Sequence, residues 1–351
     1  MNEIINQQNI TQFTNLCFEG GGVKGLAYIG AMRVFEQHNI LSNVKRIVGT
    51  SAGAINALIL ALGYTLNEQQ QELERVNFKD FMDDSTFLFR DFRRLLKNYG
   101  FYKGDYFQEW IGKLIEQKLN NKNATFADLK QLNQPDLYIC ATNLSTGYGE
   151  IFSYEHNPNM KLIDAVRMSM SIPLFFQAIT YGDHEDTYVD GGVQNNYPVK
   201  AFDRVKYIDQ NLLDIIGRKT SYYNKENDNF LAKYPGSSPY IYNKQTLGLR
   251  LDSPQEISMF RHGRLLGRKK ISNLANYSTA LLGALMKTQE NTHLHTDDWH
   301  RTVYINTHDV KTTDFDITDQ QKELLITSGI NSAEEYFKWF FDSDNSPKNI
   351  V

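Results

Sequence analysis

The stretch KRIVGTSAGAINALILAL, residues 45–62, decides how this chain folds. Residues 45–49 (KRIVG) have the character of a short buried strand, and Ala52 to Leu62 form an apolar run of helical length. The glycine-rich turn Gly49-Thr50-Ser51-Ala52-Gly53 joins the two. A strand that turns sharply into a buried helix is typical of a sheet covered by helices.

Ser51 lies at the centre of this turn, in the pattern G-x-S-x-G. Gly49 and Gly53 leave room for a strained turn, so that the Ser51 hydroxyl would project at the positive end of the helix dipole. A serine in this position becomes a nucleophile when a base takes its proton. The same residues also suit an ordinary helix cap between glycines, and the motif alone favours neither interpretation.

A second glycine cluster lies in the stretch FEGGGVKG (Phe18–Gly25). Its glycines begin at the end of an expected strand at residues 15–19, and an expected helix starts after them. Bare glycine amides at a helix start are donors for an anion, either a phosphate or the oxyanion of ester cleavage. A dinucleotide-binding pattern, G-x-G-x-x-G, fits on Gly20, Gly22 and Gly25. The phosphate-loop pattern G-x-x-x-x-G-K-[ST] is absent from the sequence.

A candidate base for Ser51 is Asp190, which ends the expected strand Thr187–Asp190 (TYVD) and precedes two glycines. Sites in α/β proteins lie at such strand ends. An aspartate before glycine is also a common turn residue. A Ser–Asp–His triad stays open because four histidines lie between residues 290 and 310, in a segment that we expect to be polar surface. They are His293, His295, His300 and His308.

The remaining pattern alternates strands and helices, which predicts an α/β fold. Further strands are expected at 137–142, 149–154 and 246–251, a helix at 161–171, and an irregular polar segment at 209–243. We expect a catalytic core at 14–205 with a helical insertion at about 66–133. A C-terminal extension at 206–345 would follow, with the strand at about 246–251 added to the core sheet.

Composition excludes several classes of protein. The chain has 351 residues, of which 41% are hydrophobic and 22% charged, as in ordinary globular proteins. A net charge of −4 argues against a general nucleic-acid binder. Cys17 and Cys140 stand in apolar stretches and are expected to be buried thiols. No apolar run reaches the roughly 20 residues of a membrane span, and no secretory signal is evident. The expected location is cytoplasmic or peripheral on membranes, with signal-peptide-independent export as an effector left open.

Three motifs together resemble one known family. GGGVKG (20–25), GTSAG (49–53) and VDGGVQNNYPV (189–199) have the order and approximate spacing of patatin-like phospholipases, and the resemblance covers about residues 14–200. It implies a patatin-like fold, similar to cytosolic phospholipase A2: a mostly parallel sheet flanked by helices, with a helical insertion and a mainly helical C-terminal extension. The dinucleotide alternative does not explain the other two motifs.

The resemblance also implies roles for residues. Ser51 would be the nucleophile and Asp190 the proton acceptor of a dyad without histidine, and Gly49 and Gly53 would shape the nucleophile elbow. The oxyanion hole would lie in the glycine loop, at Gly20, Gly21, Gly22, Val23, Lys24 and Gly25. Neither a cofactor nor calcium or another metal is implied.

The implied activity is hydrolysis of glycerophospholipid acyl esters at a membrane or micelle surface. A neutral-lipid lipase or an acyl thioesterase would use the same dyad, and a non-catalytic patatin-fold binding protein is a further alternative. No nucleic-acid partner is expected, and an activating protein partner stays open.

Two basic stretches lie beside aromatic or apolar residues, as suits an anionic membrane surface. They are FLFRDFRRLLKNYGFYKGDYF (87–107) and RHGRLLGRKK (261–270), the second followed by an apolar stretch at 277–286. Surface helices that only cover the core would give the same pattern.

Overall fold

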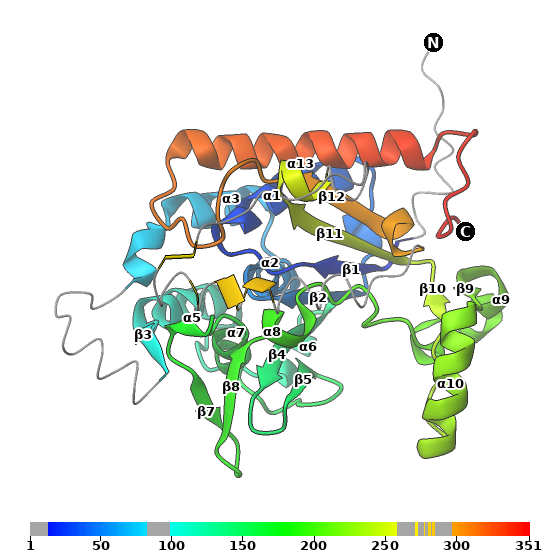
Figure 1. Ribbon diagram of the computed structural model, residues 1–351, viewed down its shortest axis with the longest axis horizontal. Coiled ribbons are helices and arrows are strands. Elements are labelled where there is room, and N and C mark those ends of the chain that lie inside the picture. The colour runs from blue at the N-terminus through cyan, green and yellow to red at the C-terminus, as the bar shows by residue number, and fades with distance from the viewer. Residues whose placement is uncertain are drawn as a thin grey trace.

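The computed structural model describes residues 13–82, 99–257 and 297–351, with isolated positions between 271 and 284. Its centre is an eight-stranded sheet of order β12-β11-β1-β2-β4-β8-β7, with β5 paired to β4 off this path (Figure 1). Helices lie against the sheet, and the expected α/β class is confirmed.

Five neighbouring strands of the sheet are parallel. They are β12 (Thr302–Asn306), β11 (Thr246–Asp252), β1 (Asn15–Phe18), β2 (Arg46–Thr50) and β4 (Asp136–Asn143). The other three run antiparallel to their neighbours. They are β5 (Tyr148–Ser153), β8 (Asp186–Asp190) and β7 (Ile179–Tyr181). The sheet is therefore mostly parallel, as the sequence predicts.

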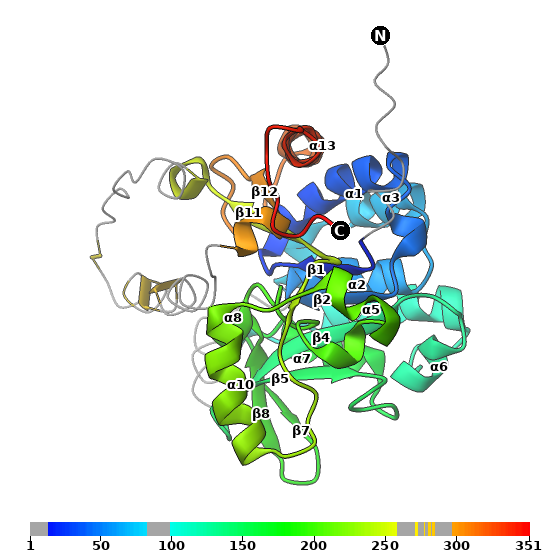
Figure 2. The same cartoon turned by 90° about the vertical axis from the view of Figure 1, so that its right-hand side faces the viewer.

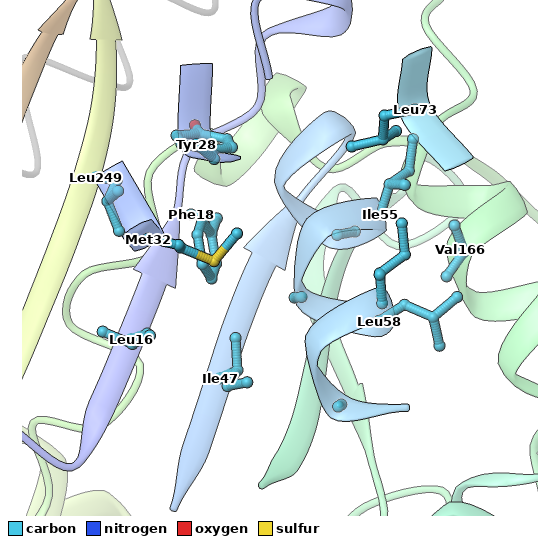
Figure 3. Packing of buried hydrophobic residues seen from close by; sticks show 14 of the residues in the cluster. Leu16, Phe18, Tyr28, Met32, Ile47, Ile55, Leu58, Leu73, Val166 and Leu249 are labelled. Carbon is cyan, nitrogen blue, oxygen red and sulfur yellow. The ribbon is translucent and has the colours of Figure 1, made fainter. Parts of the chain in front are cut away.

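The main hydrophobic core lies on one face of this sheet (Figure 3). Side chains alternate along a strand, so Leu16 and Phe18 of β1 point to this face together with Ile47 of β2. They pack against side chains such as Met32 and Ile55 of the covering helices. These helices are α1 (Ala27–Gln37), α2 (Ala52–Ala61), α7 (Leu162–Ser169) and α13 (Asp319–Phe340). Helix α2 is buried on nearly all sides, which explains its apolar sequence.

A smaller apolar cluster covers the opposite face of the sheet. It joins Cys17 and Cys140 of neighbouring strands to residues of the segment that follows β8, such as Val199 and Phe202. Both cysteines are buried free thiols, as expected. Burial raises the pKa of the Cys140 thiol to about 12, so it stays protonated.

The segment between β2 and β4 contains several short elements. They are α3 (Leu66–Arg75), the 3-10 turn η4 (Phe78–Phe81), β3 (Gly100–Tyr102), α5 (Asp105–Leu119) and α6 (Phe126–Lys130). Strand β3 pairs with β6 (Leu174–Phe176) in a separate two-stranded sheet. This pairing joins the helical insertion to the chain just after α7.

Helix α8 (Gly192–Asn195) packs on β4, and the elements after it form a side region that Figure 2 shows in front. They are α9 (Leu213–Ile216), β9 (Gly217–Arg218), α10 (Ser221–Lys233) and β10 (Tyr242–Asn243). The expectation that 209–243 is irregular is wrong, because α10 occupies its middle. Helix α10 buries only Tyr223 and so lacks a strong apolar stripe, although Thr220 caps its start.

The two candidate membrane-contact stretches lie mostly outside the described residues. Residues 87–98 of the first stretch are not described, nor are residues 261–270 of the second and most of the apolar residues 277–286 that follow it. Within the part of the chain that is described, no helix is long and apolar enough to cross a membrane.

Candidate active site

Strands β2 and β8 meet end to end along one edge of β4, and the two candidate catalytic residues lie where they meet. Thr50, the last residue of β2, pairs with Cys140. Asp190, the last residue of β8, pairs with Ala141, the next residue of β4. Since β5 occupies the other edge of β4, β2 and β8 share one edge and run toward each other. This geometry brings Ser51 and Asp190 together.

Ser51 has the strained backbone of a nucleophile elbow. Its φ of 54° and ψ of −123° are rarely adopted by a residue with a side chain. The Ser51 amide donates to Ser169 Oγ at 2.9 Å, which holds the turn in place. Its side chain is only 4% exposed, and Oγ lies 3.5 Å from Met170 Sδ. The hydroxyl is thus presented at the sheet edge beneath an apolar cover.

Asp190 is 1% exposed, and its carboxylate accepts a hydrogen bond from the backbone. The Gly192 amide donates to Oδ1 at 2.7 Å, while Oδ2 is buried without a well-aligned hydrogen bond. Burial raises the pKa of Asp190 from its ordinary 3.8 to about 6, and the Ser51 hydroxyl and the Gly192 amide oppose this shift. Ser51 is thus close enough to stabilise the carboxylate, although its rotamer directs Oγ to Met170. A carboxylate with a raised pKa is a better proton acceptor than an exposed one.

The end of α7 aligns both residues, and the sequence motifs did not identify it. Ser169 accepts from the Ser51 amide and donates to the Cys140 carbonyl at 2.6 Å, so it fastens the elbow to β4. The Ser171 carbonyl accepts from the Asp190 amide at 2.9 Å. The only signal in the sequence is the run of small and sulfur-containing side chains, Met168 to Ser171, which also suits ordinary packing.

The glycine loop lies against the elbow. A Cβ on Gly20 would lie 3.1 Å from that of Ser51, and one on Gly25 would lie 3.1 Å from that of Ala52. Gly53, the second residue of α2, approaches the end of β1, because a Cβ there would lie 2.4 Å from the Phe18 carbonyl oxygen. The structure therefore assembles the first two sequence motifs into one site.

Leu251 of β11 clamps the glycine loop from both sides. Its amide donates to Glu19 Oε2 at 2.6 Å, and its carbonyl accepts from Lys24 Nζ at 3.3 Å. Glu19 is buried and also faces Arg250, with Nε and Oε1 at 3.7 Å. Lys24 thus holds the loop to the sheet through its side chain.

The amides of the loop differ in what they bind. Those of Gly20, Val23 and Lys24 donate to the carbonyls of Asn196, Thr312 and Gly21 respectively. The amides of Gly21 and Gly22 have no acceptor among the described residues. Gly22 has a φ of +57°, and a Cβ there would lie 2.0 Å from the Thr312 carbonyl oxygen, so only glycine fits. Gly21 and Gly22 are the loop residues whose donors stay available.

The segment after Asp190 is hydrogen-bonded to the serine turn and to the glycine loop. The Thr50 hydroxyl donates to the Asn195 carbonyl at 2.9 Å. Asn196 Nδ2 donates to the Gly20 carbonyl at 3.3 Å. The third motif thus supports the first two through backbone carbonyls as well as through Asp190.

No histidine joins this pair within the described residues. His300 stacks beside Trp299 at 4.0 Å and near Trp339, and burial lowers its pKa to about 4. His308 donates its amide to Asn306 at 2.9 Å. His293 and His295 lie outside the described residues.

Similarity to known proteins agrees with this geometry. Residues 16–203 match the family model for patatin-like phospholipases. This match covers more than half of the chain, so the protein belongs to the patatin-like phospholipase family. An uncharacterised protein of Acanthamoeba polyphaga mimivirus is 32% identical over 250 residues, which make up 71% of this chain and 79% of the relative.

Two further similarities are to a curated relative and to a solved structure. A Vibrio cholerae protein named cGAMP-activated phospholipase is 30% identical over 206 residues, 52% of this chain and 54% of the relative. Among solved structures, VipD from Legionella pneumophila aligns with a TM-score of 0.55 at 16% identity, over 93% of this chain and 67% of VipD. The VipD similarity supports the patatin-like fold.

Proposed function

We propose that this protein is a serine lipid acyl hydrolase of the phospholipase A type. The observation that carries the proposal is the meeting of β2 and β8 on one edge of β4, with a strained serine and a buried carboxylate at the two strand ends. Ser51 is the nucleophile and Asp190 the general base.

The reaction proceeds in two steps. Ser51 Oγ attacks the ester carbonyl while its proton passes to Asp190, and the tetrahedral intermediate then collapses to an acyl-serine. The leaving lysophospholipid alcohol takes the proton back from Asp190. A water molecule that loses a proton to Asp190 then attacks the acyl-serine, and Asp190 returns this proton to Ser51 Oγ as the fatty acid is released.

The oxyanion of each intermediate accepts hydrogen bonds from the amides of Gly21 and Gly22. These two donors have no acceptor among the described residues, whereas three other loop amides are engaged. Each such donor, fixed before the reaction, contributes about 3–4 kcal/mol of transition-state stabilisation.

The proposed substrate class is the glycerophospholipid, and the proposed mechanism needs no calcium. A neutral lipid or an acyl thioester would react at the same dyad, so a lipid panel distinguishes these substrates. The buried hydroxyl and the raised pKa of Asp190 support catalysis over a role in binding alone.

An activating step belongs to this proposal. Ser51 and Asp190 are 4% and 1% exposed, so access of an ester to Oγ requires movement of the surrounding residues. The Vibrio cholerae relative is named for activation by cGAMP. We infer that a ligand or partner opens the site in this protein as well.

The test measures fatty-acid release from a panel of phospholipids, neutral lipids and acyl thioesters, with and without a calcium chelator. Ser51→Ala and Asp190→Asn should each lose more than about a thousandfold in activity. A fluorophosphonate probe should label the native protein at Ser51. The matched control is Ser145→Ala, in the exposed turn between β4 and β5. Full activity in either dyad variant would contradict the proposal.

A further inference from the structure

A cavity of about 420 Å³ opens beside β4 and β5. Its walls are β4 and β5 on one side and the segment that follows α8 on the other, next to the smaller apolar cluster. The residues lining it include Ile151, Asn195, Asn196, Val199, Lys200 and Arg204. Neither Ser51 nor Asp190 lines it, so it is distinct from the ester site. This volume suits a small organic molecule.

The side chain of Arg204 is held rigidly in the wall of this cavity. Its Nε donates to the Ser238 carbonyl at 2.7 Å. The rings of Phe230 and Tyr240 lie 4.6 and 4.3 Å from the centre of the guanidinium group. Its two terminal nitrogens, Nη1 and Nη2, have no hydrogen-bond partner and no ion pair among the described residues. Such a fixed fork is suited to bidentate binding of a carboxylate or phosphate.

The acid in the wall does not neutralise this cation. Glu150 accepts hydrogen bonds from Asn143 at 2.8 Å and from the Tyr188 hydroxyl at 3.0 Å. Lys200 adds a second positive charge to the lining and lies 3.6 Å from Asp298. Ile151, Val199 and other apolar residues supply a surface for an organic body. The cavity therefore combines a positive end with a partly apolar wall.

The same wall supports the catalytic residues. Asn195 accepts from Thr50, the neighbour of Ser51, through its carbonyl. Asn196 exchanges hydrogen bonds with Gly20, the first residue of the glycine loop, at 3.0 and 3.3 Å. A displacement of this segment would move both the elbow and the loop. A molecule between the segment and β5 is therefore coupled to the ester site.

We propose that this cavity is a regulatory site for a small organic anion, whose carboxylate or phosphate binds Arg204 and whose body lies against β5 and Val199. This inference rests on the proposed function, because it gives a position to the activating step. Two sources share the chemistry: a nucleotide supplies a phosphate, and a fatty-acid product supplies a carboxylate. Binding shifts the segment at Asn195 and Asn196 and so changes access to Ser51.

Calorimetric titration of the full chain tests the site without catalysis, because it uses Ser51→Ala protein. The probes are cGAMP, oleate below its micelle concentration, and inorganic phosphate as the anion without a body. We expect saturable binding of cGAMP or oleate, and the one that binds identifies the source. Inorganic phosphate should bind at least about tenfold more weakly, because it lacks the contacts of an organic body.

Two variants locate the binding. Arg204→Gln should weaken it by at least about tenfold, through loss of the charged bidentate hydrogen bonds. Ala201→Leu should weaken it as well by filling the cavity, and it leaves Arg204 in place. Lys206→Gln is the matched control, because Lys206 pairs with Glu155 outside the cavity lining. Thermal unfolding of each variant checks that it is folded.

Coupling between the cavity and the ester site is measured by the rate at which a fluorophosphonate labels Ser51 in the native protein. This rate should change severalfold when cGAMP or oleate saturates the cavity, and the change should be absent in Arg204→Gln. The regulatory site is excluded if neither organic anion binds, or if both cavity variants bind normally. Binding that leaves the labelling rate unchanged would overturn the coupling. If neither the native protein nor any variant hydrolyses lipid, while the organic anion still binds the cavity, the proposed function is contradicted and the regulatory site remains supported.

Discussion

The Asp190 carboxylate connects catalysis to stability at the scale of one residue. Because burial raises its pKa to about 6, this proposed base is mostly protonated below that pH and mostly ionised above it. We expect kcat/KM for a neutral soluble ester to rise through a single ionisation near pH 6 and then level off. A pH profile measured between pH 4.5 and 8 checks this. A profile that is flat across pH 6 would contradict the role of Asp190 as base.

The same shift makes Asp190 unfavourable for folding at neutral pH. A carboxyl with a raised pKa in the folded state contributes stability below its unfolded pKa, near 3.8, and this contribution is lost as pH rises through about 6. Asp190→Asn should therefore be more stable than the native protein at pH 8, on the order of 3 kcal/mol, and the difference should shrink toward pH 4.5. Denaturant unfolding at both pH values measures it.

The exposed Asp183 supplies the control for this experiment, because Asp183→Asn changes a carboxylate that water solvates. It should shift the free energy of unfolding by less than about 0.5 kcal/mol at either pH. A destabilised Asp190→Asn protein at pH 8 would mean that hydrogen bonds to the carboxylate outweigh the cost of burying it.

Ser169 gives a separate test of how the elbow is held. Ser169→Ala removes the acceptor of the Ser51 amide and the donor to Cys140. Leaving these buried groups unpaired should cost about 1–3 kcal/mol of stability. We expect kcat to fall about tenfold or more with little change in KM, since Ser169 is fully buried and acts through the Ser51 amide. Kinetics on a soluble ester show the split, and an equal fall in kcat after Ser145→Ala would argue against a specific role.

At the scale of elements, the pair β3 and β6 presents an unusual edge. Leu174 has a φ of 67° and Tyr99, just before β3, has a φ of 64°, although both are bulky residues. Tyr99, Phe101 and Leu174 are 60%, 41% and 37% exposed. The backbone is therefore strained where apolar side chains are exposed, and Leu174 lies three positions after Ser171 in the sequence. A lipid surface would cover such an edge favourably.

Leu174→Gly separates these two effects. It relieves the strain, so the protein should be no less stable than the native form. It also removes an exposed apolar side chain, so binding to anionic vesicles should weaken by severalfold. Vesicle co-sedimentation measures binding, and Ile215→Ser in α9 is the control, since α9 lies at the opposite end of the molecule from β3 (Figure 1). Unchanged vesicle binding in Leu174→Gly would remove this edge from the membrane contact.

The sequence predicts those parts of the site that depend on local pattern. A strand followed by G-x-S-x-G and an apolar helix places Ser51 at the end of β2, and TYVD places Asp190 at the end of β8. The pattern does not reveal that β8 runs antiparallel on the same edge of β4 as β2, because register between distant strands depends on tertiary contacts. The roles of Ser169 and Asn196 were missed for the same reason, since each acts on a residue more than 100 positions away.

At the scale of the whole molecule, the C-terminal part of the chain completes the sheet. Strands β11 and β12 extend it beyond β1, and α13 packs across α1 (Figure 1). Buried Arg301 donates two hydrogen bonds to Asp203, at 2.7 and 2.6 Å, and two to Asp298, at 3.0 and 2.6 Å. The sheet and its core thus continue across residue 205. Short strands such as β12 carry little pattern of their own, so the sequence predicted mainly helix there.

Two glycines allow α1 and α13 to pack closely, because each of them faces the backbone of the opposite helix. A Cβ on Gly329 would lie 2.0 Å from the Ala27 carbonyl oxygen, and one on Gly30 would lie 1.9 Å from that of Ile326. Gly329→Ala must push the helices apart, although alanine is the better helix former. We expect a loss of about 1–3 kcal/mol from overpacking, with a lower Tm.

Because α1 begins at Ala27, two residues after Gly25 of the glycine loop, the same displacement should reach the proposed oxyanion donors and lower kcat. Thr327→Ala, on the exposed face of α13, is the matched control and should be neutral or slightly stabilising. Thermal unfolding and ester kinetics on both variants measure the two effects. A fall in Tm without any fall in kcat would mean that the clamp of Leu251 on Glu19 and Lys24 holds the loop independently of α1. A normal Tm in Gly329→Ala would contradict the close helix contact itself.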